Sequence, residues 1–246
     1  MTASQAEASA IEPVWIVLPT FNEAENLRDA VARIHAAAPE AHVLVVDDAS
    51  PDGTGPLADA MAKEDARIAV MHRRGERGLG RALAAGLRQA AASGAAVVVA
   101  MDCDLSHDPA DVPRFVEAAR DADLVLGSRY IPGGRIPSWS FHRKLLSAAA
   151  NAFVRLLFTL PARDCTTGYR AYRADVLETI PLERLNSAGY SFQVEVLFWI
   201  ARNGSRGVRE IPITFVDRAR GASKMGAREA LAGALDLLRV RLSLLR

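Results

Sequence analysis

Apolar residues recur with two different spacings over the first 130 positions of the chain, and their alternation predicts a parallel α/β sheet. Short runs rich in Val, Ile and Leu predict buried strands, whereas apolar residues three and four positions apart predict amphipathic helices. The predicted strands cover 14–19, 43–46, 68–71, 95–101 and 123–127, and helices are predicted at 79–92 and 112–120. Asn22, with Glu25 three residues later, predicts a capping box that opens the first helix. Strands that alternate with helices in this way are typical of parallel sheets flanked by helices.

After Tyr130 the rhythm changes, and longer helices are predicted. A loop rich in Pro and Gly precedes an apolar and basic helical stretch at 141–160, and a later helix at 192–202 is followed by a strand at 207–216. A final amphipathic helix is predicted from leucines three or four positions apart: Leu231, Leu235, Leu238, Leu242 and Leu245. We therefore predict a flexible N-terminus at 1–11, one domain at 12–226, and a C-terminal amphipathic helix of the same domain at 227–246.

Composition narrows the class of protein. A hydrophobic content of 50% is enough for a core, and a formal net charge of +1 gives no reason to expect nucleic-acid binding. The two cysteines, Cys103 and Cys165, are expected to be free thiols. The first eleven residues do not resemble a signal peptide, and no apolar run is long enough to predict a membrane-spanning helix. We expect a cytoplasmic protein.

Carboxylates follow two of the predicted strands. Asp102 and Asp104 come directly after 95–101, and Asp47 and Asp48 follow 43–46. The carboxyl ends of parallel strands meet at one edge of a sheet, where open α/β folds bind ligands. Two acids spaced i, i+2 can hold a hard divalent cation together with the phosphates that the cation bridges. The sequence thus predicts a site for a nucleoside diphosphate and a metal ion.

An ordered set of motifs extends this prediction over nearly the whole chain. The motifs are Pro19 to Glu23, Asp47 to Thr54, Gly78 to Gly80, Met101 to Pro109, Gly127 to Tyr130, Thr167 to Tyr172, Gly189 to Glu195 and Arg218 to Lys224. Together they resemble the dolichol-phosphate (polyprenol-phosphate) mannose synthases of glycosyltransferase family 2, which have the GT-A fold. The resemblance implies a metal-dependent hexosyltransferase that moves mannose from GDP-mannose to a polyprenyl (dolichyl) monophosphate.

The resemblance also implies a place and a stereochemistry. The enzyme would be peripheral on the cytoplasmic face of a membrane, and small membrane subunits assist some short relatives. Its acceptor is a phosphate, largely a dianion at neutral pH, so no strong general base is needed. Direct attack by this phosphate should invert the anomeric centre and give a β-linked product.

Site residues follow from the alignment of motifs. The resemblance assigns the nucleotide sugar to Pro19, Phe21, Glu23, Val46, Asp48, Asp102, Cys103, Asp104, Arg129, Arg218 and Lys224. It assigns catalysis to Asp102, Asp104 and Arg129, and Mg²⁺ or Mn²⁺ to Asp104 with Asp102. The lipid phosphate is assigned to Arg129, Arg143 and Ser147. Phe21 departs from the usual Tyr, and Ser106 stands where some relatives have Gln near the metal.

Several features of the sequence allow two interpretations. The helix at 141–160 could lie at a lipid surface or pack on the sheet with a basic outer face. His107 could be structural or close to the metal, and Glu195 could be a buried, paired carboxylate or part of the acceptor site. For the whole protein, the alternatives are the same fold using UDP-glucose or another sugar nucleotide, and a catalytically silent nucleotide-binding membrane scaffold.

Overall fold

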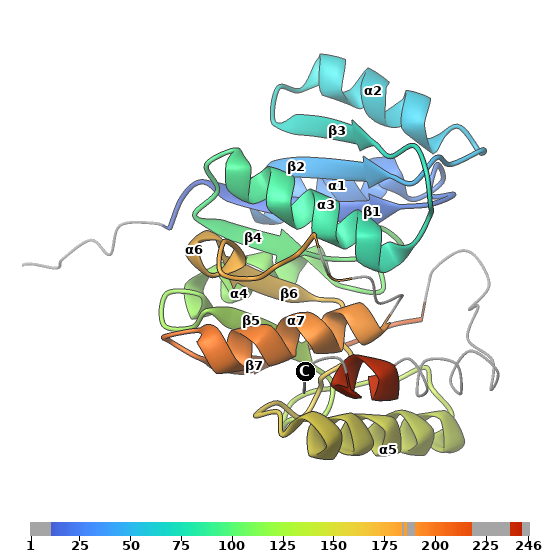
Figure 1. The fold of residues 1–246 in the computed structure, drawn as a ribbon. Coiled ribbons are helices and arrows are strands. Elements are labelled where there is room, and N and C mark those ends of the chain that lie inside the picture. The colour runs from blue at the N-terminus through green and yellow to red at the C-terminus, as the bar shows by residue number, and fades with distance from the viewer. Residues whose placement is uncertain (1–10, 184, 186–189, 218–236, 243–246) are drawn as a thin grey trace, which may run out of the picture.

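A computed structural model describes residues 11–183, 185, 190–217 and 237–242, and its strands lie in one mixed sheet between layers of helices (Figure 1). The strands are β1 (Val14–Thr20), β2 (His42–Asp47), β3 (Ile68–His72), β4 (Val97–Ala100), β5 (Leu124–Ser128), β6 (Arg170–Arg173) and β7 (Val208–Pro212). The helices are α1 (Leu27–Ala37), α2 (Thr54–Glu64), α3 (Leu79–Ala92), α4 (Val112–Ala118), α5 (Phe141–Phe158), α6 (Ala174–Leu177) and α7 (Tyr190–Asn203), with a short 3-10 turn η1 (Pro109–Asp111). The predicted α/β class with a mostly parallel sheet is confirmed.

The strand order is β3-β2-β1-β4-β6-β5-β7, and β6 alone of these runs antiparallel to its neighbours β4 and β5. Successive side chains of a strand point to opposite faces, so β1 contributes to two cores. Val17 packs with α3 and α7 on one face, whereas Ile16 and Leu18 pack with α1 and α4 on the other. Both faces of the sheet are therefore buried, which explains the continuous apolar runs in its strands.

The antiparallel strand β6 matters for the site. The carboxyl ends of β4 and β5 lie at the same edge of the sheet as the residues that lead into β6. Gly127 of β5 donates its N–H to the carbonyl of Tyr169, directly before β6 (2.9 Å). A Cβ atom built on Gly168 would lie 3.7 Å from a carboxylate oxygen of Asp102. The reversed strand thus delivers the 164–169 segment to the edge where the carboxylates emerge.

Three details correct the predictions from sequence. Asn22 is not the cap of the first helix, because α1 begins at Leu27 and Asn22 has a left-handed backbone with φ 62°. The strands predicted at 95–101 and 207–216 are shorter, at 97–100 and 208–212. Helices α2 and α6 and strand β6 were not predicted. Strand β6 is only four residues long and contains two arginines, so it lacks the apolar run of a buried strand.

The C-terminal helix is described only at 237–242. Within it Leu237 and Val240 are buried in the same core as α3 and α7, and the Arg241 side chain donates to the carbonyl of Leu157 (3.0 Å). Two leucines of the predicted stripe, Leu238 and Leu242, are exposed, so the buried side of the described part of this helix is formed by other residues than the stripe. Leu231, Leu235 and Leu245 lie outside the described residues. So do residues 1–10 of the predicted flexible N-terminus, and the domain limits stay predictions.

Helix α5 lies at one end of the molecule, beyond β7 (Figure 1). Ser140 caps its first turn, and Asn151, Val154 and Phe158 form its buried face. Its other face exposes large apolar side chains: Phe141, Leu145, Leu146, Phe153 and Leu156. None of the helices in the described ranges has the length and apolarity needed to cross a bilayer.

Candidate active site

The residues predicted for the nucleoside and the metal ion lie at the carboxyl ends of β1, β2 and β4, which are adjacent in the sheet. Each of these ends is followed by a non-glycine residue with a left-handed backbone: Asn22 (φ 62°), Ala49 (φ 55°) and Leu105 (φ 61°). Asn tolerates this conformation, whereas Ala and Leu adopt it at a cost of about 1 kcal/mol. Such residues gather at binding sites, where the surrounding contacts hold them in place.

The loop after β1 is fixed to the loop after β2 by three hydrogen bonds. The N–H groups of residues 22, 23 and 24 donate to Ser50 Oγ (3.0 Å), Thr54 Oγ1 (2.9 Å) and Asp52 Oδ2 (3.1 Å). Burial favours the neutral carboxyl of Asp52, but hydrogen bonds from Thr54 and Ala24 outweigh it and lower its pKa. These contacts hold Phe21 and Glu23 at the edge of the sheet. Pro19 and Val46 are register partners on β1 and β2, and the Val46 side chain is buried in the core.

Asp48 ties the end of β2 to the loop that leads into α3. Its carboxylate forms an ion pair with Arg73 and accepts the N–H of Gly78 (2.7 Å). From the same loop, the guanidinium of Arg77 lies 4.9 Å from the centre of the Phe21 ring. The predicted nucleoside residues Phe21 and Asp48 are therefore brought together with two arginines that the sequence analysis did not assign.

The residues after β4 place two carboxylates side by side in one tight loop. Asp104 is buried, and its Oδ1 accepts the N–H of Ser106 (3.0 Å). Asp102 lies closer to solvent, with 37% of its side chain exposed. Between them Cys103 is buried, and burial together with the nearby carboxylates raises the pKa of its thiol well above the usual range. Cys103 is therefore a small neutral residue of the core, not a nucleophile.

The His107 side chain holds this loop in place through the backbone of Asp102. The N–H of Asp102 donates to His107 Nδ1 (3.0 Å), which places the ring proton on Nε2. The ring stacks on Tyr169, with 4.9 Å between centroids, and meets Phe215 edge-on at 5.7 Å. Burial lowers the pKa of His107, so the imidazole is neutral at neutral pH. These contacts favour the structural interpretation of His107.

The donor set of this loop fits a hard divalent cation. Mg²⁺ and Mn²⁺ are commonly held in nucleotide enzymes by one or two carboxylates, and substrate phosphates and water complete the coordination. Asp102 and Asp104 supply two carboxylates, and among the described residues the Ser106 hydroxyl is buried without a hydrogen-bond partner. No cluster of three or more His, Cys, Asp or Glu ligands occurs in the described part of the chain. A cation here would depend on the phosphates of the nucleotide.

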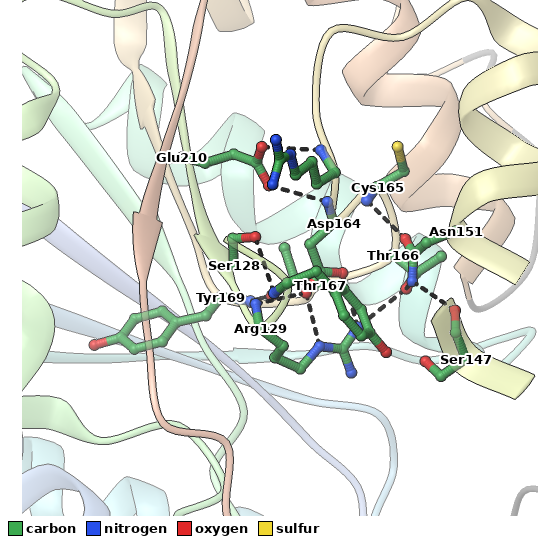
Figure 2. A network of polar contacts seen from close by, with 12 residues as sticks. Ser128, Arg129, Ser147, Asn151, Asp164, Cys165, Thr166, Thr167, Tyr169 and Glu210 are labelled. Atoms are coloured by element: carbon green, nitrogen blue, oxygen red, sulfur yellow. Dashed lines mark hydrogen bonds and ion pairs between the residues drawn. The ribbon is translucent and has the colours of Figure 1, made fainter. Parts of the chain in front are cut away.

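Arg129, directly after β5, is held in a buried polar network (Figure 2). Its Nε and Nη2 donate to the two carboxylate oxygens of Asp164 (2.7 and 2.8 Å), and its backbone N–H donates to the same carboxylate (3.0 Å). Nη2 also donates to Thr166 Oγ1 (3.1 Å), which accepts in addition the Nδ2 group of Asn151 from α5 (3.2 Å). The exposed fraction is 8% for the Arg129 side chain and 0% for Asp164.

Arg143 and Ser147 lie one turn apart on α5. Arg143 Nη1 contacts both oxygens of Asp217 (3.1 and 3.2 Å), and its guanidinium carbon lies 3.9 Å from the centre of the Trp139 ring. The Trp139 indole N–H donates to Asp217 as well (2.8 Å). Trp139 also lies 5.6 Å from the guanidinium of Arg129, so one indole links both arginines that were assigned to the lipid phosphate.

Four other residues of the site escaped the sequence analysis: Asp164, Thr166, Asp217 and Asn151. The hydrogen bonds that join them to Arg129, Trp139, Arg143 and Cys165 span 14 to 78 positions, a separation over which a single sequence gives no pairing signal. The one available signal was position: Thr166 and Asp217 each directly precede one of the motifs, at Thr167 and Arg218. Two predicted residues, Arg218 and Lys224, lie outside the described residues. Glu195 is buried on α7.

The profile of glycosyl transferase family 2 matches residues 15–180. An undecaprenyl-phosphate mannosyltransferase of Micrococcus luteus is 47% identical over 242 residues, which cover 94% of this chain and 99% of the relative. A polyprenol monophosphomannose synthase of Mycolicibacterium smegmatis is 48% identical over 221 residues, 88% of this chain and 83% of the relative.

Solved structures of lower identity share the fold. A glucosyl-3-phosphoglycerate synthase of Mycobacterium tuberculosis, in complex with Mn²⁺, UDP and phosphoglyceric acid, superposes with a TM-score of 0.69 at 19% identity, covering 94% of this chain and 77% of that one. A mannosyltransferase of Pyrobaculum calidifontis in complex with GDP-Man and Mn²⁺ gives a TM-score of 0.56 at 18% identity, covering 94% and 63%. The profile match over two thirds of the chain, together with relatives at nearly half identity, shows that this protein belongs to glycosyltransferase family 2.

Proposed function

We propose that the protein transfers mannose from GDP-mannose to a polyprenyl monophosphate and forms a β-linked polyprenyl-phosphate mannose. The observation that carries this proposal is the 47% identity to an undecaprenyl-phosphate mannosyltransferase over 99% of that relative. The similarity covers 94% of this chain, so it is not confined to the nucleotide half of the fold. A neighbour of the same fold that holds GDP-Man supports the choice of donor.

In this proposal the nucleotide lies along the carboxyl edge of β1, β2 and β4. The base is proposed to stack on the ring of Phe21, and the guanidinium of Arg77 contacts the same ring. The nucleoside is proposed to contact Asp48, Glu23 and the backbone of Cys103 at the same edge. Arg218 and Lys224 are proposed to reach the phosphates, where charge-assisted hydrogen bonds stabilise the charge that develops on the departing diphosphate.

Asp104 and Asp102 would hold Mg²⁺ or Mn²⁺. The ion, when bound, acts as a Lewis acid that stabilises the negative charge of the nucleoside diphosphate. The chain itself contributes rigidity: His107 holds the backbone of Asp102, and the N–H of Ser106 orients Asp104. These contacts limit the reorganisation that the loop would need in order to hold a cation between its carboxylates and the diphosphate.

The acceptor enters from the side of α5. Its phosphate is proposed to contact Arg143 and Ser147, next to the Arg129 network. The outward apolar side chains of α5, with Leu156 83% exposed, form a face on which a lipid chain or the membrane interface can pack. A phosphate oxygen held there attacks the anomeric carbon from the side opposite the diphosphate, and inversion follows.

Transfer of labelled mannose by the purified protein tests the proposal. We expect a chloroform-soluble product with GDP-mannose, a short-chain polyprenyl phosphate and Mn²⁺, and a β anomer by NMR. Parallel reactions with UDP-glucose and thermal-shift titrations with both nucleotide sugars separate the donors. Protein that binds nucleotide but transfers no sugar to any polyprenyl phosphate would fit a silent scaffold and overturn the proposal.

A further inference from the structure

The two arginines assigned to the lipid phosphate differ sharply in how their charge is matched. Arg129 is buried and makes a fork-shaped pair with Asp164, whose carboxylate also receives a backbone N–H. Removing one partner of a buried pair leaves an uncompensated charge and costs about 3–5 kcal/mol. A ligand phosphate cannot separate this pair without a comparable cost, so Arg129 is held by the fold.

Arg143 and Asp217 are a weak pair by comparison. Each side chain is 40% exposed. In the described residues Nη1 is the one guanidinium nitrogen of Arg143 with a hydrogen-bond partner, and it is shared between both carboxylate oxygens. Pairs this exposed are worth about 0–1 kcal/mol. A phosphate monoester carries a charge of about −1.5 to −2 near pH 7 and so attracts the guanidinium more strongly than a carboxylate does.

Trp139 fixes the geometry of this weak pair. Its ring lies against one face of the Arg143 guanidinium at 3.9 Å, which keeps the planar edge of the guanidinium turned toward Asp217. Its indole N–H holds the Asp217 carboxylate at 2.8 Å independently of Arg143. The carboxylate can therefore lose Arg143 and keep a hydrogen bond, and Arg143 can lose Asp217 and stay stacked.

We propose that Asp217 is an internal competitor of the acceptor: its carboxylate occupies Arg143 until the phosphate of the polyprenyl monophosphate displaces it. This rests on the proposed function and adds two positioning residues to it, Asp217 as the competing group and Trp139 as the platform for Arg143. The exchange leaves Arg129 and Asp164 paired.

Steady-state kinetics of Asp217→Asn test the exchange. With the competing charge removed, the KM for polyprenyl phosphate should fall by about two- to five-fold, the equivalent of a pair worth up to about 1 kcal/mol. The KM for GDP-mannose should stay as in the wild type. As a matched control, Asp175→Asn removes another half-exposed carboxylate paired with arginine, on α6, and should leave the acceptor KM unchanged.

A double-mutant cycle with Arg143→Gln makes the test specific. Arg143→Gln should raise the acceptor KM by about ten-fold, because a charge-assisted contact is lost, and Asp217→Asn should have no further effect in that background. An acceptor KM that is unchanged or raised by Asp217→Asn would overturn the inference. So would the same decrease in the Arg143→Gln background, because the carboxylate would then act through its general field. A wild-type protein without polyprenyl-phosphate mannosyl transfer would instead defeat the proposed function, and this inference with it.

Discussion

Single residues of this site are held by partners of very different strength, and this difference predicts their response to substitution. Asp164→Asn leaves the Arg129 guanidinium buried without a counter-charge, so we expect a loss of about 3–5 kcal/mol in the free energy of unfolding. Asp217→Asn breaks a half-exposed pair and should cost no more than about 1 kcal/mol. Urea denaturation of the two variants checks the contrast, and equal losses would contradict the assignment of Arg129 to the buried framework.

The carboxylate of Asp104 is predicted to be essential for turnover. Asp104→Asn keeps the shape of the side chain and an acceptor for the Ser106 N–H, but it removes the charge that a divalent cation requires. We expect mannosyl transfer to fall by at least about 100-fold, in line with losses on removing a single electrostatic contact of a transition state. Asp108→Asn, in the same loop at the cap of η1, is the matched control and should retain activity. Full activity of Asp104→Asn would remove the basis for a metal site here.

Buried histidine should make stability depend on pH. Burial lowers the folded-state pKa of His107, so the unfolded chain binds the extra proton as pH falls below about 6.5. The free energy of unfolding should therefore decrease from pH 7 toward pH 5. His107→Asn should flatten part of this slope, and the remainder includes His35, whose pKa burial also lowers. An identical slope in wild type and His107→Asn would show that His107 is not held neutral.

At the scale of elements, α5 packs Val154 and Phe158 into the core and exposes further large apolar side chains on its outer face. Leu145→Gln with Leu156→Gln removes two exposed apolar side chains of α5 and should weaken binding to anionic vesicles by at least about 100-fold, since each leucine buried in the membrane interface contributes about 1.5–3 kcal/mol. Fold and nucleotide binding should be unaffected. Arg88→Gln, on the surface of α3, is a suitable control. Unchanged vesicle binding in the double variant would place any membrane contact elsewhere.

Helix α3 reaches its position because Gly86 allows close contact with the sheet. A Cβ atom at Gly86 would lie 2.6 Å from Val17 Cγ1 and 2.9 Å from Val46 Cγ2. We expect Gly86→Ala to lower the free energy of unfolding by about 1–3 kcal/mol, as overpacked cores do. Gln89→Ala on the exposed side of the same helix should change it by no more than about 0.5 kcal/mol. The comparison of thermal or urea unfolding checks whether the helix can shift to make room.

For the molecule as a whole, the sequence predicted the sheet because its parallel strands are buried on both faces and read as unbroken apolar runs. It could not predict β6, whose Arg170 is buried through hydrogen bonds to three backbone carbonyls, those of Thr167, Gln193 and Cys165. A hydropathy pattern does not reveal that an arginine is buried in this way, because its backbone partners are set by the fold. The strand order and the pairing of Arg129 with Asp164 depend on that strand. The carboxylates at the ends of β2 and β4 could therefore be predicted, whereas Asp164 and Asp217, the partners of Arg129 and Arg143, could not.

The left-handed residues at the strand ends have a consequence for directed evolution of this enzyme. Ala49 and Leu105 hold a backbone that glycine would adopt without penalty. Leu105 also packs against the core, so glycine there would lose that contact. Selection for heat tolerance would therefore favour glycine at position 49, whereas selection for turnover would disfavour it, because the freed loop would no longer hold Asp48 in one arrangement. A library screened for both properties should separate into two populations at position 49.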